Sequence, residues 1–185
     1  NIKKMMNLFV LRYMLWIVSG LIKKIFWRFN LFIKMYVLPK YLLGSMLIFR
    51  DHSLFQMKLL LDITCVHYYF NTYAFYIHYF LQSLAYNVKF QIVVPLKKFG
   101  YVNSLMFVYP SANWLEREMW DMFGIFFYNH TSLYRILTDY GFKGHPLLKN
   151  FPLTGFIELY YDDAQKTILK EKVELMQEYR LFTLL

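Results

Sequence analysis

Residues 113–125, NWLEREMWDMFGI, are the most strongly marked stretch of the chain and predict a helix between Pro110 and Gly124. Three apolar side chains recur at helical spacing and form one stripe along this helix: Leu115, Met119 and Met122. The glycine at its end suits the left-handed conformation that closes many helices. We therefore expect this helix to cover one face of the sheet that the neighbouring stretches predict.

The polar side chains of this helix have structural interpretations. Asn113 is expected to cap the helix, and Glu116, three residues on, to complete a capping box. Glu116 and Glu118 lie near the positive end of the helix dipole. Arg117 and Asp121 have the spacing of an ion pair worth about 0.3 kcal/mol. These roles account for the helix carboxylates without any catalytic chemistry.

The residues before this helix predict a β-meander. A short helix and turn are expected at 45–55, and apolar, aromatic or alternating stretches typical of strands follow at 58–66, 73–81 and 88–94. The last of these strands is expected to end at Pro95. The sequence thus predicts an α+β fold, with helices on one side of a small, mostly antiparallel sheet.

Extensions are expected at both ends of this fold. Residues 1–38 predict a helix that stops at Pro39, and a hairpin of strands is expected at 156–161 and 166–175 after a loop at 139–146. We divide the chain into a basic, apolar, helical N-terminal arm, an α+β domain and an extended C-terminal segment that wraps a partner, at residues 1–44, 45–150 and 151–185.

Composition restricts the possible classes of protein. The 185 residues are 58% hydrophobic and 22% aromatic, and the net charge is +9. All of the excess charge lies in the first 50 residues, which hold nine basic side chains and no acidic one. The single cysteine, Cys65, excludes a disulfide framework, a Cys-rich zinc site and an iron–sulfur cluster held by this chain alone. Many aromatic residues favour an obligate interface with other proteins, and the excess of amino acids with AT-rich codons favours an organelle gene.

No transmembrane helix is expected. The longest uncharged run, residues 63–88, contains too many polar side chains to face lipid. The N-terminal arm is interpreted first as an element docked on a partner and second as a helix on a lipid surface. Its basic and aromatic residues also leave open an organellar RNA-binding protein that acts through residues 1–40.

Two groups of side chains are candidates for a metal or catalytic site. One alternative is a stand-alone metal-dependent enzyme that uses Glu118, Asp121, His130 and His145, although no HExxH motif is present. Cys65 and His67 share one side of a predicted strand and, with His78, form a weaker candidate. No GxGxxG, P-loop or GxSxG motif supports nucleotide or acyl chemistry.

A longer signature surrounds the helix. The stretch 116–125, His130, and the stretch 135–147 (RILTDYGFKGHPL) closely resemble the signature of the 30-kDa-type core subunits of respiratory complex I, NADH:ubiquinone oxidoreductase, which include mitochondrially encoded members. The stretches 110–114, 151–155 and 177–180 match as well, so the resemblance covers residues 45–182.

The resemblance implies a non-redox structural subunit of the matrix arm of mitochondrial complex I, peripheral on the inner membrane. Such a subunit binds no FMN, iron–sulfur cluster or ubiquinone itself, and is part of an enzyme only as a member of the proton-translocating complex. It would brace the cluster-bearing subunits and chiefly the large quinone-site subunit of the 49-kDa type, and would bind no nucleic acid. The resemblance assigns fold-fixing or interface roles, none of them catalytic, to Glu116, Arg117, Glu118, Trp120, Asp121, His130, Arg135, Asp139 and His145.

Overall fold

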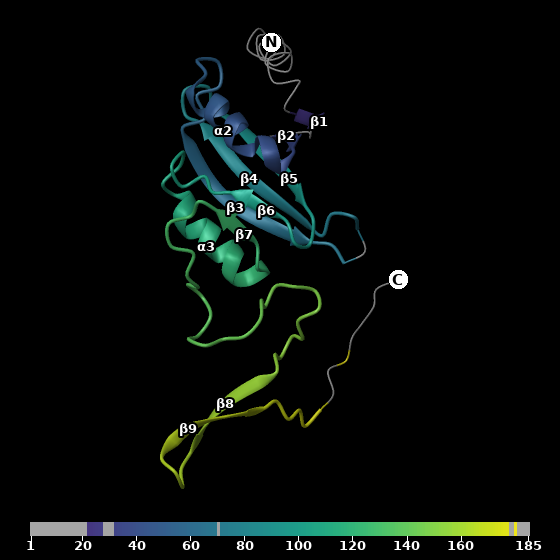
Figure 1. Ribbon diagram of the computed structural model, residues 1–185, viewed down its shortest axis with the longest axis vertical. Helices are drawn as coiled ribbons and strands as arrows, with labels where there is room; N and C mark the ends of the chain where they lie inside the picture. Colours follow the sequence, from purple (N-terminus) through teal and green to yellow (C-terminus); the bar gives the residue numbers. More distant parts are fainter. Residues whose placement is uncertain (1–21, 28–31, 70, 178–179, 181–185) are drawn as a thin grey trace.

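A five-stranded mixed sheet forms the centre of the molecule (Figure 1). The computed structural model describes residues 22–27, 32–69, 71–177 and 180. The strands lie in the order β1-β2-β5-β4-β3, and only β2 and β5 are parallel. Their bounds are Ile22–Trp27 (β1), Phe32–Val37 (β2), Leu59–His67 (β3), Phe75–Ser83 (β4) and Val88–Leu96 (β5). The predicted small, mostly antiparallel sheet is confirmed.

The hairpin from β4 to β5 follows the predicted pattern with one difference. Residues of β4 alternate between buried and half-buried, as expected of a strand with one face on the core. Asn87 supplies a turn residue with φ of 51°. The strand runs past Pro95 to Leu96, so the predicted end was wrong. Pairing with β2 stops at Val93, and a proline beyond that point removes no hydrogen bond on that side of β5.

The predicted helix over residues 1–38 is wrong for the part of this segment that the structure describes. Residues 22–27 and 32–37 are strands β1 and β2. Ile33, Met35 and Val37 are buried while Lys34 and Tyr36 are half-buried, which is the period of a strand. From the sequence alone, this apolar pattern fits both a helix and a strand. The pairing of β2 with β5 selects the strand. Residues 1–21 of the predicted arm lie outside the described residues.

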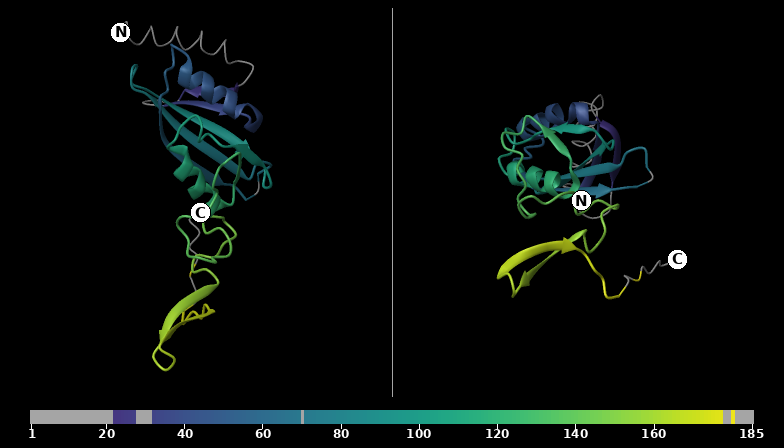
Figure 2. Two further views of the ribbon diagram at one scale, coloured as in Figure 1. Left: turned by 60° about the vertical axis from the view of Figure 1, so that its left-hand side comes forward. Right: turned by 60° about the horizontal axis from the view of Figure 1, so that its bottom comes forward.

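Two helices cover one face of the sheet (Figures 1 and 2). Helix α2, Leu42–Asp51, follows the short 3-10 turn η1, Pro39–Tyr41, and helix α3 spans Ala112–Phe123. The ring of Phe49 in α2 meets the ring of Phe90 in β5 edge to face, with centroids 5.7 Å apart. Met119 and Phe123 of α3 belong to the same hydrophobic core.

Within the described residues, no helix has the length and apolar character needed to cross a membrane.

Smaller strand pairs complete the chain. Strands β6, Tyr101–Asn103, and β7, Phe126–Tyr128, form a short parallel pair on either side of α3 in sequence. Strands β8, Ile157–Asp162, and β9, Thr167–Lys172, form the predicted hairpin, which extends away from the sheet (Figures 1 and 2). The sheet itself starts with strands that precede residue 45. The division of the chain into three segments remains a proposal.

Candidate functional site: the buried carboxylates of helix α3 and the surfaces around them

Glu116 is completely buried beneath α3 and binds the loop after β6. Its carboxylate accepts hydrogen bonds from the backbone N–H of Leu105 at 2.7 Å and from the Ser104 hydroxyl at 2.5 Å. Burial raises its pKa to about 7, although these two hydrogen bonds lower it. The predicted capping box is therefore wrong. Helix α3 begins after Ser111, which makes no side-chain cap, and Glu116 points inward because its helix face is covered by the sheet and by this loop.

His130 lies beside this carboxylate and contacts the first turn of α3. Its Nε2 lies 3.3 Å from the Asn113 carbonyl and 4.0 Å from a Glu116 oxygen, and its Nδ1 accepts the N–H of Ser132 at 3.1 Å. This pattern fits a neutral ring that carries its hydrogen on Nε2. His130 thus ties the segment after β7 to the first turn of α3.

The buried Tyr79 hydroxyl has no hydrogen-bond partner among the described residues, and burial raises its pKa well above the usual value.

Asp121, five residues after Glu116 on the same helix, organises the loop that follows β7. One carboxylate oxygen accepts hydrogen bonds from Arg135 Nη1 at 3.0 Å and from the Thr138 hydroxyl at 2.7 Å. The other oxygen accepts three backbone N–H groups, those of Ile136, Leu137 and Thr138. Burial would raise the pKa of Asp121, but the hydrogen bonds from Thr138, Leu137 and Ile136 together lower it below its ordinary value. The predicted pair with Arg117 is wrong, since Arg135 supplies the cation.

His145 and Trp120 close the end of α3. The Nδ1 of His145 donates to the Asp121 backbone carbonyl at 2.9 Å, and its ring packs edge-on against Trp120. Gly124 has φ of 72°, which confirms the predicted left-handed cap. A Cβ atom at Gly124 would lie only 2.7 Å from the His145 ring, so this contact also requires glycine.

The remaining predicted residues are closer to the surface. Arg117 donates from Nε to the Tyr134 carbonyl at 3.2 Å, and its guanidinium lies 5.0 Å from the Trp114 ring centroid. Glu118 is partly exposed on another side of the helix, as the two-residue spacing from Glu116 requires. Asp139 is exposed and accepts the N–H of Tyr140, which shapes the following turn. The structure therefore forms a Glu116 cluster, which includes His130, and an Asp121 cluster, which includes Trp120, Arg135 and His145. Arg117, Glu118 and Asp139 lie outside both.

The structure does not assemble either candidate metal site. Both oxygens of Asp121 are filled by hydrogen-bond donors, and the nearest contacts of His130 and His145 are backbone groups. Strand register places Cys65 opposite Ile77 and His78 opposite Thr64, so Cys65 and His78 lie on different faces of the sheet. Within residues 22–27, 32–69, 71–177 and 180, no three His, Cys, Asp or Glu residues are grouped as metal ligands would be.

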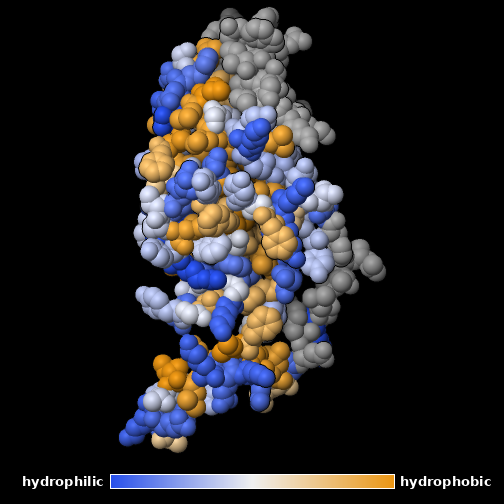
Figure 3. Space-filling view, in the orientation of Figure 1, coloured by the Kyte–Doolittle hydropathy of each residue, from blue (hydrophilic) through white to orange (hydrophobic). Residues whose placement is uncertain are grey.

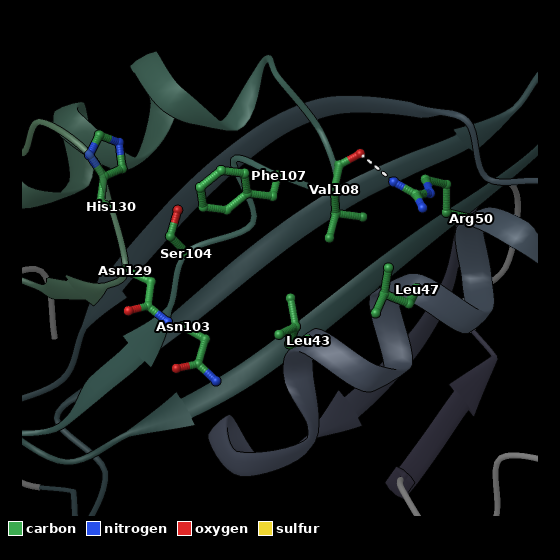
Figure 4. Close-up of a pocket in the computed structure, with 9 residues that line it drawn as sticks. All are labelled: Leu43, Leu47, Arg50, Asn103, Ser104, Phe107, Val108, Asn129 and His130. Carbon is green, nitrogen blue, oxygen red and sulfur yellow. Dashed lines mark hydrogen bonds between the residues drawn. The ribbon is translucent and has the colours of Figure 1, made fainter.

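A surface pocket of about 510 Å³ lies between α2 and the loop after β6 (Figure 4). Apolar side chains of Leu43, Leu47 and Phe107 form part of its wall. Arg50 lines the pocket and donates to the Val108 carbonyl at 3.1 Å. Ser104 and His130, which also line it, are held by the contacts of the Glu116 cluster. Arg50, Ser104 and His130 are thus each held by contacts within the fold.

Some residues with clear roles could not be found from the sequence. Thr138 bonds Asp121 through both its hydroxyl and its N–H, and the only hint is its position three residues after Arg135. Ser104 contacts Glu116 from a loop twelve residues earlier, for which sequence carries no signal. Tyr109 joins the same region to the segment between α2 and β3 by donating from its hydroxyl to the Met57 carbonyl at 2.7 Å.

Large apolar side chains remain exposed over much of the molecule (Figure 3). Figure 3 shows them among polar residues over the centre of the domain and again over the C-terminal hairpin. Tyr101 and Tyr128 lie side by side on the outer face of β6 and β7, with ring centroids 6.1 Å apart. Others lie in the loops and in the hairpin, among them Phe107, Tyr140, Leu153 and Ile168. Apolar exposure on this scale is typical of surfaces that contact other proteins.

Comparison with known sequences identifies related proteins. Residues 35–157 match a family described as "Respiratory-chain NADH dehydrogenase, 30 Kd subunit". The chain is 47% identical over 147 residues to NADH-ubiquinone oxidoreductase subunit 9 of Prototheca wickerhamii, which covers 80% of this chain and 77% of that one. The protein of the same name from Acanthamoeba castellanii is 52% identical over 130 residues, which is 70% of this chain and 66% of the relative.

Solved structures share the fold at lower identity. A trypsin-resistant fragment of Nqo5 superposes with a TM-score of 0.58 and 22% identity, over 67% of this chain and 99% of the fragment. A chain of an archaeal respiratory membrane complex, the membrane-bound sulfane sulfur reductase, superposes with a TM-score of 0.65 and 17% identity, over 83% and 87% of the two chains. At these identities the comparison establishes the fold alone.

Proposed function

Because the chain belongs to the family of the 30-kDa subunit of respiratory-chain NADH dehydrogenase, we propose that it is a structural, non-redox subunit of complex I. In this role it supports electron transfer from NADH to ubiquinone by bracing the subunits that carry the quinone site and the clusters. FMN, iron–sulfur clusters and ubiquinone belong to other subunits, and the chain itself is not catalytic. Its place is the matrix side of the mitochondrial inner membrane, peripheral within the complex.

The observation that carries this proposal is the β8–β9 hairpin. Its strands extend away from the sheet, and apolar side chains such as Ile157, Leu159 and Ile168 are more than half exposed. An isolated two-stranded hairpin is at best marginally stable in water, so another surface has to cover this one. The loop that precedes the hairpin in sequence is fixed to the domain through Asp121 and Arg135. We propose the large 49-kDa-type quinone-site subunit as the chief partner.

The two buried clusters support a bracing role. The carboxylates of Glu116 and Asp121 both accept hydrogen bonds from donors within the chain. Each joins α3 to a loop distant in sequence, so these residues hold the exposed surfaces in fixed positions. The same commitment leaves neither residue available as a general base for a substrate.

The test is recovery of the chain from its organelle. The full chain carries an affinity tag, mitochondrial membranes are dissolved in a mild detergent, and the recovered species are separated by size and assayed for NADH:ubiquinone reductase activity. Recovery in a large, NADH-oxidising complex supports the proposal. Recovery as a small free species contradicts it. A stoichiometric metal on that small species would favour the metal-dependent enzyme, and bound RNA would favour the nucleic-acid alternative.

A further inference from the structure

The two faces of the β8–β9 hairpin differ in chemistry. Residues paired across an antiparallel ladder point to the same face, so the register sorts the side chains. We define the apolar-basic face as Ile157, Leu159, Tyr161, Ile168, Lys170 and Lys172. The acidic face consists of Glu158, Tyr160, Asp162, Thr167, Leu169 and Glu171. One face therefore has two positive charges and no negative one, and the other has three negative charges and no positive one.

The exposed apolar surface belongs mainly to the first of these faces. Its four apolar side chains are between 53% and 68% exposed. On the acidic face, Tyr160 is 42% exposed and Leu169 is half-buried. The Tyr160 hydroxyl donates to a Glu171 oxygen at 2.9 Å, which partly satisfies that face within the hairpin. Phe156, at the base of the hairpin, is in edge contact with Phe151.

The two positive charges of the apolar-basic face lie toward the base of the hairpin. Tyr161 and Ile168 are opposite one another next to the turn, and neither is paired across the hairpin with a charged residue. Lys170 is opposite Leu159, and Lys172 is opposite Ile157, toward the domain. The face is therefore apolar at the tip and cationic toward its base.

From this pattern we infer that the hairpin docks by its apolar-basic face alone, onto a protein surface that is apolar beneath the tip and bordered by carboxylates near the base. The inference rests on the proposed function, since it names the chemistry of the partner surface that the hairpin covers. Burial of the four apolar side chains supplies the affinity, and the two lysines select the partner and fix the register. The acidic face stays directed away from this partner, because carboxylates facing carboxylates would repel.

Matched substitutions on the two faces test the inference in the full-length tagged chain. Leu159→Ser with Ile168→Ser removes apolar area from the apolar-basic face. Tyr160→Ser with Leu169→Ser removes it from the acidic face, at adjacent positions of the same strands. The first pair is expected to lower the fraction of chain recovered in the complex by about tenfold or more, and the second pair to change it less than about twofold. Equal losses, or a larger loss from the second pair, would overturn the inference.

A charge test is independent of apolar area. Lys170→Glu with Lys172→Glu is expected to lower recovery severalfold, whereas Glu158→Lys with Glu171→Lys is expected to leave it within about twofold. The reverse order would overturn the inference. All variants are compared by thermal unfolding of the free chain, and equal melting temperatures show that the domain is unchanged.

These outcomes separate the inference from the proposed function. If the unsubstituted chain is not recovered in a complex, the proposed function fails. If the unsubstituted chain is recovered but the two faces behave alike, only the choice of face is wrong.

Discussion

The carboxylate of Asp121 lies 3.0 Å from the guanidinium of Arg135, and this pair joins helix α3 to a loop fourteen residues later. The Asp121 side chain is completely buried, while that of Arg135 is 28% exposed. Arg135 also donates to the Gly144 carbonyl at 2.9 Å, so one cation links the helix to both ends of the loop. Asp121 therefore helps to fix the path of this loop.

Replacement of Asp121 is expected to loosen this loop. Asp121→Asn keeps the shape of the side chain, but its amide nitrogen cannot accept the N–H groups that one carboxylate oxygen now accepts. We expect the free energy of unfolding to fall by about 2–4 kcal/mol, as measured by urea denaturation. Asp139→Asn is the matched control, since that side chain is exposed and should change stability by less than about 0.5 kcal/mol. Equal effects of the two variants would contradict the role assigned to Asp121.

Gly124 is expected to tolerate alanine poorly for two reasons. Its φ of 72° strains any residue with a Cβ, and that atom would lie 2.7 Å from the His145 ring. Gly141, with φ of 74°, has open space around it and provides the control. We expect Gly141→Ala to cost about 1 kcal/mol of unfolding free energy and Gly124→Ala about 2–3 kcal/mol. A smaller loss for Gly124→Ala would mean that the His145 contact is not required.

Glu116 should make stability fall as pH rises. Its pKa in the folded protein, about 7, is above the value of an exposed glutamate, so the folded state holds this proton more tightly than the unfolded state. Its contribution is complete at low pH, falls from about pH 4.5 to pH 7, and is absent above that. Glu116→Gln mimics the protonated form and should show less loss of stability between pH 5 and pH 8 in urea titrations. An identical pH dependence in the variant would refute this assignment.

Asp121 should change stability with pH in the opposite direction. Its pKa is lowered in the folded state, so its stabilising contribution is present at neutral pH and is lost as pH falls through the folded pKa, below the ordinary range for aspartate. In wild type this loss begins as the pH falls below the ordinary pKa of aspartate. Unfolding of the Asp121→Asn variant, followed by circular dichroism below pH 4, should lack this component. Parallel acid unfolding curves for the variant and the wild type would count against it.

Cys65 should react slowly with alkylating reagents. Burial raises the pKa of its thiol to about 12, so very little thiolate exists at pH 8. We expect iodoacetamide, followed by mass spectrometry, to label the folded chain at least about tenfold more slowly than the chain in denaturant. Rapid labelling under native conditions would show that the thiol is accessible and ionised.

Structure that depends on neighbouring residues could be predicted from the sequence. The strands of the meander, the end of α3 at Gly124 and the β8–β9 hairpin all follow from patterns of a few neighbouring residues, and these were confirmed. Strand β2 could not be predicted, because its apolar pattern fits a helix or a strand until β5 is available as a partner. The role of Glu116 could not be predicted either. A capping role is chemically reasonable, but in the structure Ser104 and Leu105 donate to its buried carboxylate instead.

The amino-acid sequence by itself determined the class of the fold, the signature along 116–147 and the concentration of positive charge in the first 50 residues. These features depend on residue type and spacing within one stretch of chain. Only the tertiary structure decided which donors satisfy Glu116 and Asp121, and which side chains share a face of the hairpin. Those outcomes depend on contacts between residues far apart in sequence and on strand register, where a shift of one position would exchange the two faces.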